Sequence, residues 1–359
     1  MSLPHTDDEI IDNEDLSDLI ETDQTLTKSI IIKIPDHLKG SRLDAALASI
    51  IPEISRSKIT NWIKDGSILV DKKTLKPKDK VNGGEDVEIN AVIEEHTDAK
   101  PENIPLDIVF EDDYIIVINK PRDFVVHPGN GNWNGTILNA VLHHNPNAQY
   151  LARAGIVHRL DKDTTGLMVI AKTDLAQINL VKQLENRTVS RIYRAVVHGQ
   201  PPKNGIVNKN IGRDNRNRIK MATIEHGGKP SLTNYRVIEY FDNFSYIECK
   251  LETGRTHQIR VHLKSIGYPI VGDPLYGSPK TVFAQHIMDA IASLDRQALH
   301  ALKLSFIHPV TERKMEFRSK IPNDMRFLLS ELSNEEANFE DDYETDADDS
   351  EWEIIYVKE

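Results

Sequence analysis

The sequence predicts an α+β protein, in which a small N-terminal α/β unit precedes a larger domain built on a mixed, largely antiparallel sheet. Short strand-like segments cluster along residues 106–325 without the regular strand–helix alternation of a doubly wound parallel sheet. Residues 29–90 combine short strands with two helices, which indicates a separate compact unit. Neither a GxGxxG nor a Walker motif occurs, so nothing supports dinucleotide or NTP binding.

The elements of the N-terminal unit follow from apolar spacing. Strands are expected at 30–34, 68–70 and 87–89, and helices over 42–51 and from 55 onward. Ser41 is a candidate N-cap for the first helix, and Asp65-Gly66 ends the second helix in a turn. The unit is rich in lysine and arginine, and these side chains suit contacts with phosphates.

The larger domain follows an acidic, proline-containing linker at 91–105. Its strands are expected at 106–110, 114–119, 167–171, 191–197, 232–239, 244–251 and 301–307. Its helices are expected at 136–144, 173–185 and 258–265, with an irregular helical stretch at 282–294. The domain is expected to end at residue 325, where an acidic C-terminal tail, 326–359, begins.

Charge is distributed unevenly along the 359 residues, whose formal net charge is −12. Residues 1–28 carry nine acidic side chains and one lysine, and residues 331–359 carry thirteen acidic side chains and one lysine. Residues 29–330 hold 34 acidic and 42 basic side chains, a net charge of +8. Exposed charges are screened over about 8–10 Å at physiological salt, so acidic, disordered ends need not cancel the field of a basic cleft. The body of the protein therefore suits a nucleic-acid partner.

The composition is that of a soluble protein, with 39% hydrophobic and 28% charged residues. No apolar run approaches the roughly 20 residues of a membrane-spanning helix, and the acidic first 28 residues are unlike a signal or transit peptide. The single cysteine, Cys249, excludes an intrachain disulfide framework and fits a reducing compartment. We expect a cytoplasmic monomer without a membrane partner.

The densest polar segment is residues 155–166, GIVHRLDKDTTG, which directly precedes the apolar run 167–171. A polar loop set against a buried strand can hold a carboxylate in fixed geometry. Carboxylates act as nucleophiles or bases at sugar anomeric carbons, where the transition state carries positive charge. Composition alone leaves Asp161, Asp163 and Asp174 open for that role, and a polar turn that caps a helix or strand is the structural alternative.

Seven of the 14 histidines in the chain raise the question of a metal site. They are His127, His143, His144, His158, His257, His262 and His300. Their spacing fits no zinc pattern, because His257 and His262 are five residues apart and no HExxH motif occurs. We therefore expect no metal site.

Five ordered motifs resemble those of RluA-type pseudouridine synthases. The segment GIVHRLDKDTTGLMVIAKT, at 155–173, resembles the active-site motif HRLDxxTSG, with Thr165 in place of the usual serine. The other motifs are EDDYIIVINKPRDFVVHPGNGNWNGTILNAVL at 111–142, SRIYRAVVHG at 190–199, LETGRTHQIRVHLKSIGYPIVGDPLYG at 251–277 and RQALHALKLSFIHP at 296–309. The HPGxGN wording of the first is closest to the RluD branch. The resemblance runs from about residue 30 to 325 and implies a pseudouridine synthase catalytic domain over 106–325.

The N-terminal unit resembles an S4-type RNA-binding domain over SRLDAALASIIPEISRSKITNWIKDGSILVDKKTLKPKDKVNGGEDVEI, residues 41–89. The resemblance implies RNA binding, for which Arg42, Arg56 and Lys58 are candidate phosphate contacts. The structural alternative is a basic solvated surface on a small domain.

The resemblance to the synthases also implies roles for single residues. Asp161 matches the catalytic aspartate, which either attacks C1′ of the uridine or removes a ribose proton. Arg260 matches the arginine that pairs with this aspartate and lowers its pKa, and Tyr193 matches the tyrosine that stacks near the target base. Arg159 is expected to project into the RNA and hold the target nucleotide out of the stack. Leu160 and Ile259 are expected to wall the pocket, and His158 and Arg255 complete the expected RNA-binding set.

The expected function is isomerisation of specific uridines to pseudouridine in large-subunit, 23S-type ribosomal RNA. In this reaction the C1′–N1 bond breaks, the detached uracil rotates, and a C1′–C5 bond forms. The isomerisation is redox-neutral, so neither a metal nor an organic cofactor is expected. The alternatives are a tRNA pseudouridine synthase of the same fold and a non-catalytic S4-domain protein that binds RNA or assists ribosome assembly.

Overall fold

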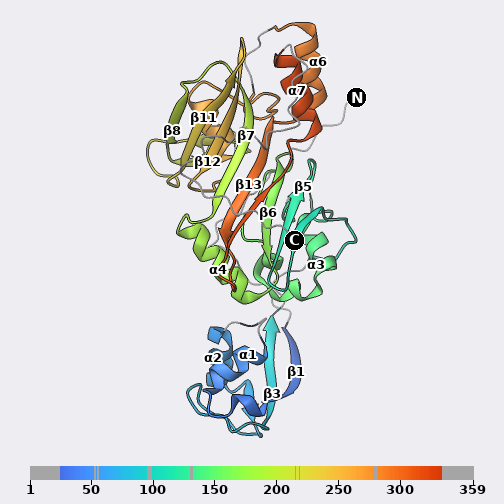
Figure 1. Ribbon diagram of the computed structural model, residues 1–359, viewed down its shortest axis with the longest axis vertical. Coiled ribbons are helices and arrows are strands. Elements are labelled where there is room, and N and C mark those ends of the chain that lie inside the picture. The colour runs from blue at the N-terminus through green and yellow to red at the C-terminus, as the bar shows by residue number, and fades with distance from the viewer. Residues whose placement is uncertain are drawn as a thin grey trace, which may run out of the picture.

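A computed structural model describes residues 25–51, 54, 56–94, 99–129, 132–214, 216–217, 219–277 and 282–333. The molecule is elongated, with the small N-terminal unit at one end and the large sheet domain above it (Figure 1). Most of the acidic segments expected at 1–28 and 326–359 lie outside the described residues.

The N-terminal unit is a three-stranded antiparallel sheet covered by two helices. Its elements are β1 (Thr25–Lys33), α1 (Leu43–Ile50), α2 (Arg56–Asp65), β2 (Ile68–Val70) and β3 (Asp86–Glu94), with sheet order β1-β3-β2. Leu43, Leu47 and Ile59 from the helices pack against Val87 and Ile89 of β3 in one apolar cluster. The unit therefore has a core of its own, separate from that of the large domain.

Three predictions for this unit are corrected. The N-cap of α1 is Arg42 and not Ser41, and the Arg42 side chain bonds Asp44 rather than a backbone N–H. β1 begins at Thr25, so the expected acidic extension 1–28 overlaps it. β3 continues to Glu94, into the expected linker, because its antiparallel pairing with β1 extends to Thr25.

The large domain is built on a nine-stranded sheet with the order β4-β5-β6-β13-β7-β12-β11-β8, and β14 pairs with β13. The strands are β4 (Ile108–Glu111), β5 (Ile115–Lys120), β6 (Thr165–Ala171), β7 (Ser190–His198), β8 (Asn204–Asn208), β11 (Leu232–Tyr240), β12 (Phe244–Leu251), β13 (Leu299–Ile307) and β14 (Lys314–Arg318). All described pairs in this sheet are antiparallel except β6 with β13. The predicted α+β class with a mixed, largely antiparallel sheet is confirmed.

Helices and a small second sheet surround this core. The helices are α3 (Ile137–His144), α4 (Asp174–Glu185), α5 (Gln258–Ser265), α6 (Gln285–Leu294) and α7 (Asn323–Ser333), with 3-10 turns at Asp36–Leu38, Pro146–Tyr150 and Ala152–Gly155. β9 (Ile211–Arg213) and β10 (Met221–Thr223) form a two-stranded sheet. Helices α6 and α7 lie together at the end far from the N-terminal unit (Figure 1).

β6 shows why the apolar run 167–171 forms a strand. Side chains alternate between the two faces of a strand. Met168 and Ile170 join one hydrophobic cluster, whereas Leu167 and Val169 join another. Because both faces of β6 are buried, its sequence is continuously apolar rather than alternating. The strand directly follows the polar loop that contains Asp161, and it gives that loop a rigid support.

The C-terminal end of the domain differs from the prediction. Helix α7 runs from Asn323 to Ser333, so the boundary expected at residue 325 falls inside it. Its buried side chains Leu328 and Leu329 belong to the main core. Helix α6 begins at Gln285, three residues later than the helical stretch expected from Val282. Strands β8, β9, β10 and β14 were not predicted, because their sequences, NGIVN, IGR, MAT and KMEFR, lack the apolar run ILV that marks β2.

None of the helices in the described part of the chain combines the length and the apolar character needed to cross a membrane.

Candidate active site

A pocket of about 740 Å³ opens between the Asp161 loop, β7, the small β9–β10 sheet and residues 251–260. Its lining contains eight lysine or arginine side chains but three carboxylates. The basic residues are Arg153, Arg159, Arg187, Arg191, Arg213, Lys229, Arg255 and Arg260, and the acidic ones are Asp161, Glu185 and Glu252. The whole chain is acidic, yet this pocket presents positive charge to a ligand.

Asp161 lies at the end of an extended segment, just before the tight turn that leads into β6. Its carbonyl accepts the backbone N–H of Thr164 at 3.0 Å, which closes the turn. The carboxylate Oδ2 accepts a hydrogen bond from Arg260 Nη1 at 2.9 Å, and Oδ1 lies 3.9 Å from His257 Nε2. Burial alone would raise the pKa of Asp161, but His257 and Arg260 outweigh it and hold the pKa below its usual range. The carboxylate is therefore ionised at neutral pH.

Arg260 links Asp161 to a second carboxylate deeper in the protein. Its Nε and Nη2 atoms donate to the two oxygens of Asp273 at 2.8 and 2.9 Å, while Nη1 donates to Asp161. Asp273 also accepts the backbone N–H groups of Leu275 and Tyr276. Burial would lower the pKa of Arg260, but the two carboxylates raise it. This chain of charge-assisted bonds fixes the direction in which the Asp161 carboxylate points.

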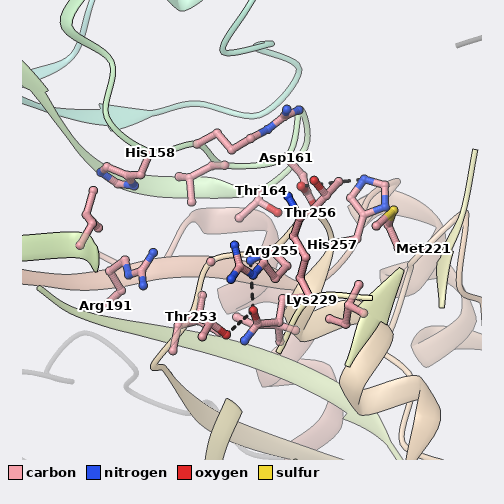
Figure 2. Close-up of a pocket in the computed structure, with 18 of the residues that line it drawn as sticks. His158, Asp161, Thr164, Arg191, Met221, Lys229, Thr253, Arg255, Thr256 and His257 are labelled. Atoms are coloured by element: carbon pink, nitrogen blue, oxygen red, sulfur yellow. Dashed lines mark hydrogen bonds and ion pairs between the residues drawn. The ribbon is translucent and has the colours of Figure 1, made fainter. Parts of the chain in front are cut away.

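His257 is a second group near the Asp161 carboxylate. From the sequence alone it was a candidate only for a metal site. It precedes α5 with a left-handed backbone, φ 54°. Its Nδ1 lies 2.8 Å from the Tyr276 hydroxyl, which accepts the backbone N–H of Met221 at 2.9 Å. The tyrosine hydrogen is thus available to Nδ1, which leaves Nε2–H on the side of Asp161 (Figure 2).

Four buried polar side chains hold the turn after Asp161 in place through hydrogen bonds. Lys120 Nζ donates to the carbonyls of Pro121, Phe124 and Lys162 at 2.9, 2.8 and 2.6 Å. The remaining contacts to the turn are Arg296 to the Asp163 carbonyl, Gln297 to the Thr164 hydroxyl and His300 to the Thr165 hydroxyl. Burial lowers the pKa of Lys120 to about 7, and the three carbonyls match the three N–H groups of its ammonium form.

Replacing Lys120 with methionine is expected to reduce kcat by at least about tenfold, because displacement of the Asp161 turn misplaces the carboxylate. Loss of the ammonium also leaves the Pro121 and Phe124 carbonyls without a donor, whereas the Lys162 carbonyl keeps the backbone N–H of Phe124, and the free energy of unfolding should fall by about 2–4 kcal/mol. Single-turnover rates and denaturant unfolding measure the two effects. Lys172→Met is the matched control, because Lys172 bonds Glu111 and the Asp112 carbonyl outside the pocket. An unchanged kcat in Lys120→Met would contradict the positioning role.

Tyr193 lies on β7 and lines the same pocket, with 5% of its surface exposed. Its strand neighbours are Cys249 of β12 and Ala301 of β13. Burial raises the pKa of Tyr193; the charge of Arg191 opposes this rise in part, and the charge of Asp161 adds to it. The side chain therefore presents a protonated phenol beside the carboxylate.

The other expected pocket residues also line the cavity. They are His158, Arg159, Leu160, Arg255 and Ile259. Leu160 and Ile259 are each 4% exposed and belong to the main core, so they both wall the pocket and pack the domain. Arg255 is exposed at the rim, where its backbone N–H donates to Gln258.

Arg42, Arg56 and Lys58 do not join this pocket, because they lie in the N-terminal unit. Arg42 and Arg56 both donate to the buried carboxylate of Asp44, each at 3.0 Å, and keep about half of their side chains exposed. Lys58 Nζ lies 5.7 Å from the Trp62 ring centroid. These cations are thus held in place by their own domain while their outer surfaces face solvent.

Over the described ranges, no group of three or more histidine, cysteine, aspartate or glutamate side chains is arranged to hold a metal ion.

Comparison with known proteins places the two parts of the chain in established families. Residues 114–265 match the family model described as RNA pseudouridylate synthase, and residues 41–87 match the S4 domain model. The chain is 47% identical over 365 aligned residues, 97% of each protein, to the ribosomal large subunit pseudouridine synthase D of Neisseria meningitidis serogroup B. It is 49% identical to the protein of the same name from Escherichia coli K12, over 86% of this chain and 94% of that protein.

One solved structure agrees with the fold. Human RNA pseudouridylate synthase domain containing 4 superposes with a TM-score of 0.50 and 24% identity, covering 63% of this chain and 92% of that chain. The extent and identity of the sequence matches show that the chain belongs to the RNA pseudouridylate synthase family.

Proposed function

We propose that this protein isomerises specific uridines to pseudouridine in large-subunit ribosomal RNA. The observation that carries the proposal is the ionised Asp161 carboxylate, held by Arg260 at 2.9 Å inside a basic pocket. The relatives named ribosomal large subunit pseudouridine synthase D, which align with 85% or more of this chain, support the choice of substrate. We further propose that the protein acts as a cytoplasmic monomer. We also propose that it uses neither a metal nor an organic cofactor, since the isomerisation is redox-neutral.

The pocket is suited to bind a uridine that has been extruded from the RNA, and not one that is stacked in a helix. A uridine within a stack does not expose C1′ and C5 together, so the base must leave the stack to reach a buried carboxylate. Asp161 lines the pocket and has 16% of its side chain exposed. Arg159, two residues earlier on the extended segment, can fill the vacated place in the RNA with its planar guanidinium.

The proposed chemistry uses the carboxylate and the phenol. Asp161 acts at the ribose, either by attack on C1′ or by removal of a ribose proton, and the C1′–N1 bond breaks. The uracil rotates next to Tyr193, C5 bonds to C1′, the hydrogen on C5 leaves as a proton, and N1, no longer bonded to the ribose, takes up a proton. Asp161 is regenerated as the carboxylate in either route. Arg260 contributes by keeping Asp161 ionised before each turnover.

A tRNA synthase of the same fold is the main alternative, and mapping of modified positions separates the two. Pseudouridines are mapped in ribosomal and transfer RNA from cells with and without the gene. We expect one or more positions in large-subunit RNA to revert to uridine in the deletion strain, and plasmid-borne wild type to restore them. Loss of pseudouridine from tRNA alone would contradict the substrate assignment.

The N-terminal unit is proposed to grip RNA away from the chemistry. The exposed Lys73 and Lys76 are suited to phosphate contacts. Replacing both with glutamine should weaken RNA binding and make the slope of log affinity against log salt shallower by about 1.5, with kcat unchanged. Lys203 and Lys320, exposed on the large domain outside the pocket, provide the matched double control. Equal slopes for the two double variants would contradict a role of the unit in binding.

A further inference from the structure

Arg191 is a buried cation in the pocket for which the mechanism above has no use. It lies on β7, two residues before Tyr193, and is 7% exposed. Among the described residues, no hydrogen bond or ion pair reaches its guanidinium, and the buried Nε has no acceptor. Burial lowers the pKa of Arg191, and Tyr193 and Glu252 oppose this only in part. A charge buried without a partner destabilises the free protein, so its presence needs an explanation.

The pocket wall beside Arg191 is formed by a glycine. Gly254 faces Arg191, and a Cβ atom at that position would lie 2.6 Å from Arg191 Nη1. Both residues line the pocket. Because Gly254 has no side chain, the Arg191 guanidinium can lie against its backbone at the pocket wall.

His158 supplies an additional donor on the same side of the pocket. Its Nε2 accepts the backbone N–H of Val169 at 3.0 Å, and burial lowers its pKa to about 3, so the ring is neutral. In a neutral ring whose Nε2 accepts, the hydrogen is on Nδ1. That Nδ1 is buried and has no partner in the described part of the chain. Figure 2 shows His158 and Arg191 at one side of the pocket, with Asp161 and His257 at the other.

We propose that Arg191, with the Nδ1–H of His158 beside it, binds a phosphodiester group of the substrate RNA next to the extruded uridine. A guanidinium and an N–H donor without protein acceptors match the non-bridging oxygens of a phosphate. If the site bound the neutral edge of a uracil instead of a phosphate, the buried positive charge of Arg191 would remain without a negative partner. This site deepens the proposed function and rests on RNA being the substrate. It would fix the backbone next to the target while Asp161 acts on the ribose.

The experiment compares wild type, Arg191→Gln and the control Arg313→Gln, which removes an equal charge from an exposed site outside the pocket. Binding of a short uridine-containing RNA by the full-length proteins is measured over a salt series. Arg191→Gln should bind about tenfold to a hundredfold more weakly, with the salt slope reduced by about 0.7. The melting temperature without RNA should rise by about 2 °C, because an unpaired buried charge is removed. An unchanged slope, or a melting temperature lower by several degrees, would overturn the proposal.

One further variant and a set of modified RNAs test the phosphate contact directly. Gly254→Ala should reproduce the binding defect, because the added methyl group displaces the guanidinium without removing its charge. RNAs that carry one neutral methylphosphonate linkage should include a position that weakens binding by wild type but not by Arg191→Gln. If no linkage behaves in this way, the phosphate site is wrong even when pseudouridine still forms. If wild type forms no pseudouridine in any RNA, the proposed function itself fails.

Discussion

Replacing Asp161 with asparagine is expected to reduce pseudouridine formation by about 10⁴-fold or more, while RNA affinity changes little. The amide keeps the size of the side chain and can still bond to Arg260, but it cannot act as a nucleophile or base at the ribose. The phosphate contacts proposed for the pocket and the N-terminal unit remain. Single-turnover rates measured by chemical mapping of pseudouridine, together with RNA binding by fluorescence anisotropy, separate the two quantities.

Asp163→Asn and Asp174→Asn are the matched controls for this substitution. Both are carboxylates that composition alone could not distinguish from Asp161. The structure places Asp161 in the pocket lining, whereas Asp163 and Asp174 are not part of it. Each control should keep most of the wild-type rate. Residual turnover near wild type in Asp161→Asn would refute the assigned role of that carboxylate, and full activity loss in Asp174→Asn would reassign it.

Replacing Arg260 with methionine is expected to lower the free energy of unfolding by about 3–5 kcal/mol and kcat by about 10²- to 10³-fold. The Asp273 side chain is fully buried and would lose both of its bonds to the guanidinium. Asp161 would lose its nearest cation. Denaturant unfolding and steady-state kinetics measure these changes. Arg255→Met, at the exposed rim, is the control and should leave stability within about 0.5 kcal/mol.

The Arg260 substitution should also change the pH dependence of activity. In wild type the pKa of Asp161 is lowered, so its carboxylate stays ionised to a lower pH in the folded protein than in the unfolded chain. Its contribution to stability is complete above the ordinary pKa of about 3.9 and is lost as the pH falls from there through the lower pKa of the folded state. Without Arg260 the effect of burial is less opposed, and the pKa of Asp161 rises. The acidic limb of the kcat/KM profile should therefore move to higher pH. A profile that keeps the wild-type limb would show that Arg260 does not control this ionisation.

The fold was predictable from the sequence where apolar patterns were long. The continuous apolar run at 167–171 indicated a buried strand, and β6 is buried on both faces. Helix α7 was missed because the acidic residues that follow it dominated the composition there, although Leu328 and Leu329 face the core. Helix starts were predicted within a residue or so where threonine provides the cap, as at Thr136 and Thr173.

The site was predictable only in part, because its geometry depends on contacts between distant segments. Asp161 and Arg260 are 99 positions apart, and only the family motifs related them to each other. Nothing local in the sequence indicates that Lys120 supports the Asp161 turn or that Asp273 holds Arg260 from behind. Arg191 is one of many arginines in the chain, and only the three-dimensional structure shows that none of the described residues forms a hydrogen bond or ion pair with its guanidinium.

The most direct measurement follows the hydrogen that the isomerisation must remove. Formation of the C1′–C5 bond displaces the hydrogen on C5, so large-subunit ribosomal RNA prepared with tritium at uridine C5 reports each turnover as tritium released to solvent. Purified full-length protein should release tritium in amounts equal to the pseudouridine formed, and Asp161→Asn should release none above background. No release by wild type from naked RNA or from ribosomal particles, or equal release by both proteins, would contradict the account.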